Sequence, residues 1–198
     1  GRSRADSVLT ALHIADKTNM QVIPHVCCRD KNMIAMRSLL LGAHMNGLRN
    51  LLLVTGDPVP SDSRKLITGV FDYNSIRLMQ YVSEMNEELF PEDRFFFGGA
   101  LNYNFPNAEQ VAERMKKKTE AGASFFLTQP IFSAADIERI AWLKERTGAK
   151  IIGGLLPPVS KRNALFIRNE MAGMDIPDEV LNKYHDGMTR EEGEEAGA

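Results

Sequence analysis

The chain has 198 residues and a net charge of −2, and 43% of its residues are hydrophobic. These values fit a single globular domain, residues 1–198, that can bury a substantial core. They argue against a nucleic acid or an anionic membrane as partner, because either would require an excess of Lys and Arg on one face.

Short apolar runs rich in branched and aromatic residues alternate along the chain with amphipathic segments. The amphipathic segments predict helices at about 6–17, 32–46, 75–89, 107–122 and 133–148. The apolar runs predict strands at 21–28, 50–56, 94–101, 124–130 and 150–157. Each predicted strand is followed by a helical segment.

The helices at 107–122 and 133–148 carry clear start and stop signals. Ser133 and Asp136 have the spacing of a capping box, and Gly148 stands where a left-handed residue ends a helix. Asn107 and Gly122 play the same two parts in the earlier helix.

The inward faces follow from the helical period. In the earlier helix Val111 and Met115 are expected to point inward. In the later helix Ile137, Ile140 and Ala141 share an apolar face.

No apolar run approaches the roughly 20 residues that span a bilayer, and no signal peptide opens the chain. We therefore expect a cytoplasmic protein without a membrane partner. The chain starts at Gly1 rather than Met and enters a helical pattern almost at once, so we expect a piece of a longer protein.

Strands without polar alternation, each separated from the next by a helix, predict a parallel sheet that is buried on both faces. Two α/β architectures fit this pattern, the (β/α)₈ barrel and the doubly wound open sheet. The chain lacks G-x-G-x-x-G at a strand-to-helix turn and lacks G-x-x-x-x-G-K-[ST]. The missing nucleotide signatures favour the barrel.

Polar side chains close the otherwise apolar strands. In parallel architectures the carboxyl ends of the strands meet the ligand, so these residues are candidates for a binding site. They are His25, Arg29, Asp30, Thr55, Gly56, Asp57, Asn102, Tyr103, Asn104, Thr128, Gln129, Ser160 and Asn163.

Several candidates have an alternative structural reading. His25 could be a core histidine bound to backbone, and Asp57 could cap its loop through an Asx turn. Gln129 could satisfy a neighbouring strand end. The lysines at 116–118 could form a solvated helix face.

Two further features bear on the site. Cys27 and Cys28 are adjacent and would point to opposite faces of a strand, so we expect neither a disulfide nor a metal site there. Residues 57–71 form a long polar segment with prolines, and loops of this length in a compact domain are usually binding loops.

Four motifs together resemble the methylenetetrahydrofolate reductase family. They are "PHVCCRD", "LLLVTGDPVP", "KKKTEAGASFFLTQPIF" and "GGLLPPVSKRNALF", in this order and spacing. The resemblance covers essentially the whole chain. It is closest to the bacterial form, found alone or fused to a homocysteine methyltransferase domain.

The resemblance implies a flavoprotein (β/α)₈ barrel, of which this chain supplies about strands three to seven. NAD(P)H would reduce FAD, and the reduced flavin would then pass a hydride to methylenetetrahydrofolate, with both substrates using one site in turn. This reaction belongs to one-carbon metabolism and methionine biosynthesis. A homo-oligomer or a fusion with the methyltransferase domain is implied as well.

The resemblance also gives a role to Asp57. The matching family position lies beside the isoalloxazine, where a negative charge disfavours the anionic reduced flavin and stabilises the cationic iminium formed from folate. Asp57 is therefore the expected catalytic carboxylate.

Other residues match ligand contacts of the family. Gln129 matches a glutamine that binds the pterin ring, and Asn163 falls where a second amide contacts folate. His25, Thr55 and Gly56 match strand ends that contact the flavin.

Two lysines of the basic run match family residues near the FAD phosphates. The match is to Lys118 and, less closely, Lys117.

The chain departs from the family at three points. The family's stacking aromatic falls near Ile167, so that role would pass to Phe166. The expected tyrosine and histidine after the third predicted strand are Leu101 and Phe105, which leaves Tyr103 as a substitute. The family's general-acid glutamate belongs to the first barrel strand, which is not in this chain, so we expect residues 1–198 alone to be inactive in folate reduction.

Two other functions stay open. A barrel that kept the fold could bind flavin or folate without catalysis. An unrelated barrel aldolase or lyase would need a Schiff-base lysine at a strand end, and the predicted strands carry none.

Overall fold

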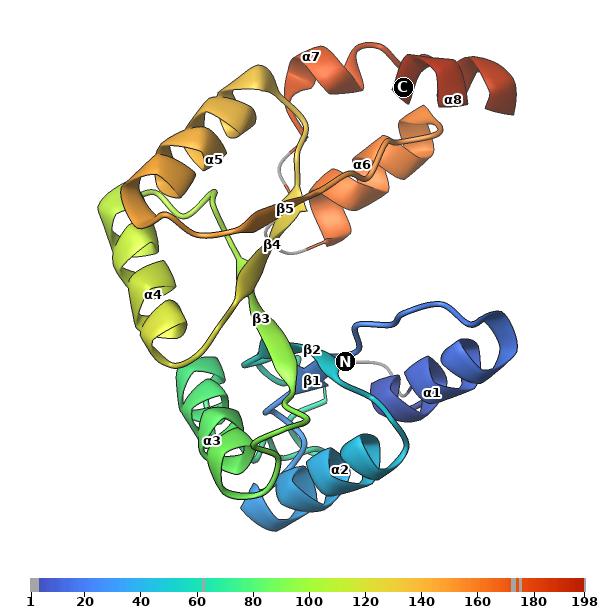
Figure 1. Cartoon of the computed structure of the whole chain (residues 1–198). Coiled ribbons are helices and arrows are strands. Elements are labelled where there is room, and N and C mark those ends of the chain that lie inside the picture. The colour runs from blue at the N-terminus through green and yellow to red at the C-terminus, as the bar shows by residue number, and fades with distance from the viewer. Residues whose placement is uncertain (1–3, 62, 172–173, 175, 198) are drawn as a thin grey trace. The chain divides into compact units, whose positions relative to one another are not determined.

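The computed structural model describes residues 4–61, 63–171, 174 and 176–197. Helices and strands alternate up to residue 170, and two further helices follow without a strand between them (Figure 1). The helices are α1 (Ser7–Thr18), α2 (Met33–Met45), α3 (Ser75–Glu88), α4 (Ala108–Glu120), α5 (Ala134–Thr147), α6 (Lys161–Glu170), α7 (Asp178–Leu181) and α8 (Arg190–Gly197). The strands are β1 (His25–Cys27), β2 (Asn50–Val54), β3 (Phe96–Leu101), β4 (Phe125–Pro130) and β5 (Ile151–Gly154).

The strands form one sheet in the order β1-β2-β3-β4-β5. β1 pairs with β2 in parallel, with His25 opposite Leu52, and β2 pairs with β3 in parallel, with Leu52 opposite Gly98. Strands that follow one another along the chain lie next to one another, each reached through a helix. This parallel arrangement confirms the predicted α/β class and is consistent with consecutive strands of a (β/α)₈ barrel.

All five strands are shorter than predicted, with β5 confined to Ile151–Gly154 instead of 150–157, and the end of β2 has an identifiable cause. β2 ends at Val54, because Gly56 adopts φ +89°, a left-handed conformation that no strand continues. β1 begins only at His25, and Ile23, in the run before it, is 44% exposed.

The chain divides into two compact units. The first comprises Gly1–Ala100 and Arg114–Phe126, and the second comprises Leu101–Glu113 and Leu127–Ala198. The single domain expected from the sequence stays a prediction.

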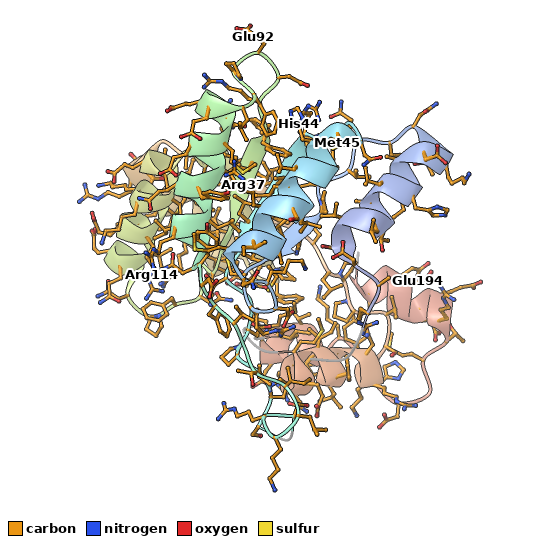
Figure 2. All side chains as sticks on the ribbon, turned by 90° about the horizontal axis from the view of Figure 1, so that it is seen from below. Arg37, His44, Met45, Glu92, Arg114 and Glu194 are labelled. Carbon is orange, nitrogen blue, oxygen red and sulfur yellow. The ribbon has the colours of Figure 1, made fainter. Side chains whose placement is uncertain are left out.

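The core of the first unit surrounds β2. Leu51, Leu52 and Leu53 are successive residues and all are fully buried, so both faces of this strand are covered. Burying each such side chain contributes about 1.5–3 kcal/mol. Figure 2 shows Arg37 on α2, whose guanidinium donates to the hydroxyl of Tyr81 on α3 at 2.8 Å.

The second unit has its own apolar cluster. Ala164 and Ile167 on α6 pack with Ile176 and Tyr184, all nearly inaccessible to solvent. The Tyr184 hydroxyl donates to the carbonyl of Pro158 at 2.7 Å, which satisfies its polar atom inside this cluster.

The predicted helix caps are confirmed. Ser133 and Asp136 form a reciprocal capping box, and Gly148 ends α5 at φ +66°. Asn107 accepts a hydrogen bond from the backbone of Gln110 at 3.1 Å, and Gly122 follows α4 at φ +103°. These short-range signals are sufficient to bound both helices.

The predicted inward faces have different outcomes. Val111 and Met115 on α4 are buried, as predicted. On α5 the residue that packs completely is Leu143, whereas Ile137 is 58% exposed.

None of the helices in the described residues has the length and apolarity that a bilayer crossing requires. The same residues contain no group of three or more His, Cys, Asp or Glu side chains arranged to hold a metal ion.

Candidate functional site

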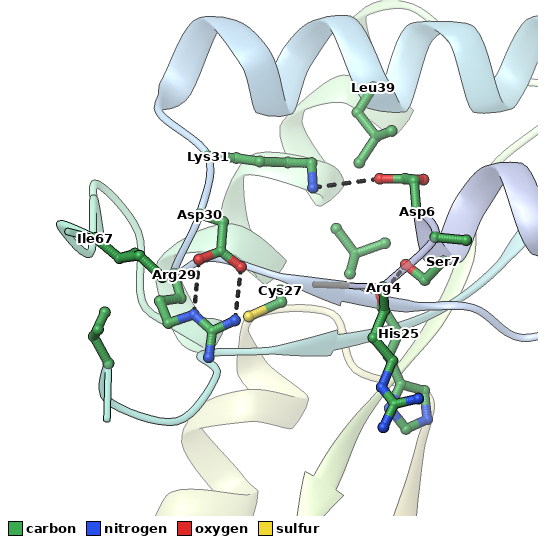
Figure 3. Close-up of a pocket in the computed structure, with 13 residues that line it drawn as sticks. Arg4, Asp6, Ser7, His25, Cys27, Arg29, Asp30, Lys31, Leu39 and Ile67 are labelled. Atoms are coloured by element: carbon green, nitrogen blue, oxygen red, sulfur yellow. Dashed lines mark hydrogen bonds and ion pairs between the residues drawn. The ribbon is translucent and has the colours of Figure 1, made fainter. Parts of the chain in front are cut away.

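A pocket of about 590 Å³ opens in the first unit beside the carboxyl end of β1 (Figure 3). Its wall combines the segment that begins α1, the residues that end β1, and part of the loop at 57–71. Val59 and Ile67 contribute the loop side of the wall. A cavity of this size falls in the range of small-molecule sites.

Two ion pairs line the pocket. Arg29 donates two parallel hydrogen bonds to Asp30, from Nε to Oδ1 at 2.7 Å and from Nη2 to Oδ2 at 2.9 Å (Figure 3). Lys31 Nζ lies 3.5 Å from Asp6 Oδ2. The hydrogen bond from Arg29 holds the pKa of Asp30 below its usual value. With Arg4 added, the lining carries one more positive than negative charge.

His25 forms part of the same wall. Its backbone carbonyl accepts a hydrogen bond from Ser7 Oγ at 2.7 Å, which ties the start of α1 to β1. Desolvation lowers the pKa of His25 below 6.5, so the ring is neutral at pH 7. A neutral imidazole can both donate and accept a hydrogen bond here.

The end of β2 makes a sharp corner. Thr55 Oγ1 accepts a hydrogen bond from the backbone of Ser75 at 2.9 Å, which adds a second cap to α3. A Cβ on Gly56 would lie 2.2 Å from Cys27 Sγ. Only glycine fits at this corner, because both the left-handed backbone and the close approach to β1 exclude a side chain.

Asp57 follows the corner directly and is exposed. Its backbone carbonyl accepts a hydrogen bond from Arg29 Nη1 at 3.4 Å. Among the described residues its carboxylate has no hydrogen-bond partner, so the Asx turn considered from the sequence is not formed. The carboxylate is therefore free to meet a ligand.

The two candidate lysines on α4 differ. Lys117 is exposed, whereas Lys118 is partly buried and donates from Nζ to the carbonyl of Ala100 at 2.7 Å. Burial, with Arg114 nearby, lowers the pKa of Lys118 to about 8. Lys118 holds the end of β3 with one proton and keeps two others for a further acceptor.

Tyr103 and Gln129 lie in the second unit. Tyr103 is completely buried and its hydroxyl donates to the carbonyl of Pro130 at 2.6 Å. Burial raises the pKa of Tyr103 to about 12, so the phenol stays protonated. Gln129 is partly exposed near the end of β4, and its amide has no partner in the described part of the chain.

Asn163 and Phe166 lie on α6 in the same unit. Asn163 Oδ1 accepts a hydrogen bond from the backbone of Val159 at 3.2 Å, which leaves its NH₂ group available. Phe166 is 55% exposed, whereas Ile167 is buried in the apolar cluster. The Phe166 ring is therefore accessible to a ligand, whereas the Ile167 side chain is not.

The predicted residues thus fall into two groups. The first unit brings His25 to the pocket and places Thr55, Gly56 and Asp57 at the adjacent strand end. The second unit carries Tyr103, Gln129, Asn163 and Phe166. The assignment of all these residues as ligand contacts stays a prediction.

Sequence reasoning missed part of the pocket lining. It did not single out Arg4, Asp6 or Lys31, all of which line the pocket. Lys31 follows the strand-end motif directly, which is a weak signal. The positions of Arg4 and Asp6 depend on how α1 packs against β1, and no local pattern reveals it.

The fold and its polar strand ends define a parallel α/β protein with a candidate ligand site. Residues 1–196 match the family profile described as methylenetetrahydrofolate reductase. The chain therefore belongs to the methylenetetrahydrofolate reductase family.

Individual relatives are distant. The chain is 24% identical over 198 residues to 5,10-methylenetetrahydrofolate reductase of Escherichia coli (strain K12), covering 94% of this chain and 60% of the relative. It is 24% identical over 192 residues to the protein of the same name from Buchnera aphidicola subsp. Schizaphis graminum, covering 93% and 60%. Methylenetetrahydrofolate reductase 1 of Schizosaccharomyces pombe is 25% identical over 185 residues, or 86% of this chain and 29% of that protein. The chain spans about 60% of the length of the bacterial relatives.

Proposed function

We propose that the protein reduces methylenetetrahydrofolate to methyltetrahydrofolate with FAD as cofactor and NAD(P)H as electron donor, by a ping-pong reaction. The supporting observation is the family match over residues 1–196, which includes the corner where Asp57 follows β2. Membership in one-carbon metabolism, including methionine biosynthesis, is part of this proposal.

The residues in the first unit fit a flavin dinucleotide. The pocket has a suitable volume, a neutral His25 and an excess of one positive charge, which suits a ligand that carries a diphosphate. His25, Thr55 and Gly56 would contact the flavin, and Lys118 and Lys117 would neutralise its phosphates. The bound flavin would supply hydride acceptance and donation.

Asp57 would act through its charge. An exposed carboxylate beside the reacting ring stabilises positive charge that develops on the folate and opposes negative charge on the cofactor. The strand corner at Gly56 holds its backbone in place, so the charge needs little reorganisation when the substrate arrives.

The second unit would bind the folate. The Gln129 amide can donate and accept hydrogen bonds at a pterin edge, and the Asn163 NH₂ group can add another donor. Phe166 offers an exposed ring for stacking. Tyr103 would position β4 through its bond to Pro130, and it is proposed as a contact of the flavin cofactor rather than of the folate.

The association with other chains is part of the proposal only as a family expectation. A homo-oligomer or a fusion to a homocysteine methyltransferase domain would suit the family, and the cytoplasmic location stays a prediction.

The test has two stages. The purified full-length protein should show flavin absorbance bands, or take up FAD on reconstitution. In the full-length protein, Asp57→Asn should then keep FAD, raise its reduction potential, and slow folate reduction more than NAD(P)H oxidation in stopped flow. Each effect corresponds to about 1–3 kcal/mol.

The outcomes separate the candidate functions. Absence of flavin bands and of flavin uptake would refute the proposal. Flavin binding without folate turnover would favour a non-catalytic flavin- or folate-binding module. Equal slowing of both half-reactions in Asp57→Asn would contradict the role given to this carboxylate.

A further inference from the structure

One residue, Arg29, contacts both ends of the loop at 57–71. At the first end its Nη1 donates to the carbonyl of Asp57 at 3.4 Å. At the other end its own carbonyl accepts a hydrogen bond from the backbone of Val70 at 2.7 Å. The loop therefore begins after β2 in contact with Arg29 and ends in contact with Arg29 again.

The guanidinium is held in place by its neighbour. Asp30 binds Nε and Nη2 through both carboxylate oxygens, which fixes the plane of the fork and directs Nη1 toward Asp57. The Arg29 side chain is only 22% exposed. Because Asp30 fixes the guanidinium through Nε and Nη2, its remaining nitrogen Nη1 can hold the Asp57 carbonyl rigidly.

The corner before the loop packs against the same residue. A Cβ built on Gly56 would lie 3.2 Å from Arg29 Cβ, so the backbone at the corner after β2 lies directly against Arg29. Cys27 Sγ lies 3.6 Å from the carbonyl of Thr55. The segment 27–29 therefore supports residues 55, 56 and 57 in succession.

The loop held in this way forms a wall of the pocket. Val59 and Ile67 lie on the loop and line the pocket together with Arg29 and Asp30. Within the loop, Arg64 Nε donates to the carbonyl of Val59 at 3.1 Å. A change at Arg29 would thus reach both the pocket wall and the residue that begins the loop.

We infer that Arg29 is a positioning residue that holds Asp57 and the loop at 57–71 in the arrangement that the reaction uses. Arg29 acts through Asp57 and takes no part in hydride transfer itself. The inference rests on the function proposed for Asp57, and it gives Arg29, until here only one of the strand-end candidates, a specific role.

The first test measures the loop without any flavin. Hydrogen–deuterium exchange is compared for the unmodified protein, Arg29→Met, Arg29→Lys and the control Arg77→Met, which replaces an exposed arginine on α3. Arg29→Met should speed amide exchange in peptides covering 57–71 by about five- to tenfold, because the loop loses a charged donor at one end. The control should leave this exchange unchanged.

Arg29→Lys separates charge from geometry. A lysine keeps the positive charge but cannot form two parallel bonds to Asp30 while reaching Asp57. It should therefore speed exchange nearly as much as Arg29→Met. Unchanged exchange in Arg29→Met, or full protection in Arg29→Lys, would show that the Arg29 guanidinium does not hold the loop at 57–71.

The second test asks whether Arg29 acts through Asp57. In stopped flow of the full-length protein, Arg29→Met should slow the folate half-reaction about five- to tenfold in the unmodified background and less than about twofold in the Asp57→Asn background. NAD(P)H oxidation should change less than the folate half-reaction. Equal slowing by Arg29→Met in both backgrounds would overturn the inference, because it would show that Arg29 acts independently.

The two tests also separate this inference from the proposed function. If the unmodified protein binds no flavin, the proposed function fails. The exchange experiment needs no cofactor, so it still supports or overturns the contact between Arg29 and the Asp57 loop.

Discussion

Two arginine–aspartate pairs lie at opposite ends of the strands in the first unit. One joins distant parts of the fold, and the other orients a side chain at the candidate site. At the amino ends, Arg49 precedes β2 and pairs with Asp93, which comes shortly before β3, with Nε 2.7 Å from Oδ1. At the carboxyl ends, Arg29 pairs with its own neighbour Asp30. The first pair joins residues 44 positions apart, and the second joins adjacent residues.

The amino-end pair is part of a saturated cluster. Arg49 Nη1 also donates to the carbonyls of His44 at 2.8 Å and Leu48 at 3.0 Å. The ring of His44, labelled in Figure 2 at the end of α2, stacks on Phe90 with centroids 3.5 Å apart. The bonds to Asp93 and to the carbonyl of His44 tie the start of β2 to the segment before β3 and to the end of α2.

The carboxyl-end pair leaves donors for other partners. Because Asp30 is adjacent in the sequence, its pairing with Arg29 closes no long loop and adds little to the stability of the fold. The pair instead orients Arg29 toward the loop and the pocket. The same pair of residue types therefore supports the fold at one end of the strands and the candidate site at the other.

The largest effect should come from the corner at Gly56. Gly56→Ala forces a left-handed alanine and places Cβ 2.2 Å from Cys27 Sγ, so it should lower the free energy of unfolding by about 2–4 kcal/mol. The matched control at the amino ends is Gly47→Ala, where φ is +80° but nothing lies within 4 Å. It should cost only about 1 kcal/mol. Urea unfolding measures both, and equal losses would mean that the contact with β1 adds nothing.

The next effect concerns Lys118, which holds the carboxyl end of β3. Its pKa is about 8 in the folded protein and 10.5 ordinarily, so the unfolded chain binds more protons between these values. Stability should therefore rise with pH from about 8 to 10.5 by about 2 kcal/mol relative to Lys118→Met. The measurement is urea unfolding of both proteins across this range. If the difference in free energy of unfolding between the two proteins did not change with pH, Lys118 would not have a lowered pKa in the folded protein.

These residues also show how much the sequence could predict. The strands at β2, β3 and β4 follow from apolar runs, and the ends of α4 and α5 follow from caps such as Asn107, Ser133 and Gly148, because both signals are local. Gly56 was expected to be a strand residue that contacts flavin. The sequence did not reveal its left-handed backbone, because that conformation depends on how closely β2 passes β1.

Side-chain orientation was less predictable than element boundaries. The period of α5 places Ile137 on an apolar face, yet Ile137 is exposed and Leu143 is buried, because the partners of α5 decide which side is covered. The basic run on α4 likewise gives no sign that Lys118 turns inward while Lys117 stays exposed. The pocket needs residues from α1, β1 and the loop at 57–71, so no single motif contains it.

The third effect tests the amino-end pair. Arg49→Met leaves Asp93 and the carbonyls of His44 and Leu48 without their donor, so it should cost about 1–2 kcal/mol in urea unfolding. Arg77→Met is the control and should stay within about 0.5 kcal/mol. A loss for Arg49→Met no larger than the control would remove the distinction between a pair that supports the fold and an ordinary surface arginine.

The smallest effect on stability should come from Asp30→Asn. The Asp30 side chain is 48% exposed and its partner is its neighbour, so the loss of this pair should change the free energy of unfolding by less than about 0.5 kcal/mol. The same substitution releases one edge of the Arg29 fork, because an amide offers only one acceptor oxygen. Amide exchange at 57–71 should therefore accelerate by about two- to fivefold although global stability is nearly unchanged. Arg49→Met should show the opposite pattern, with a clear loss of stability and little change confined to this loop. If Asp30→Asn instead destabilised the whole protein as much as Arg49→Met, both pairs would support the fold, and the contrast between the two ends of the strands would be wrong.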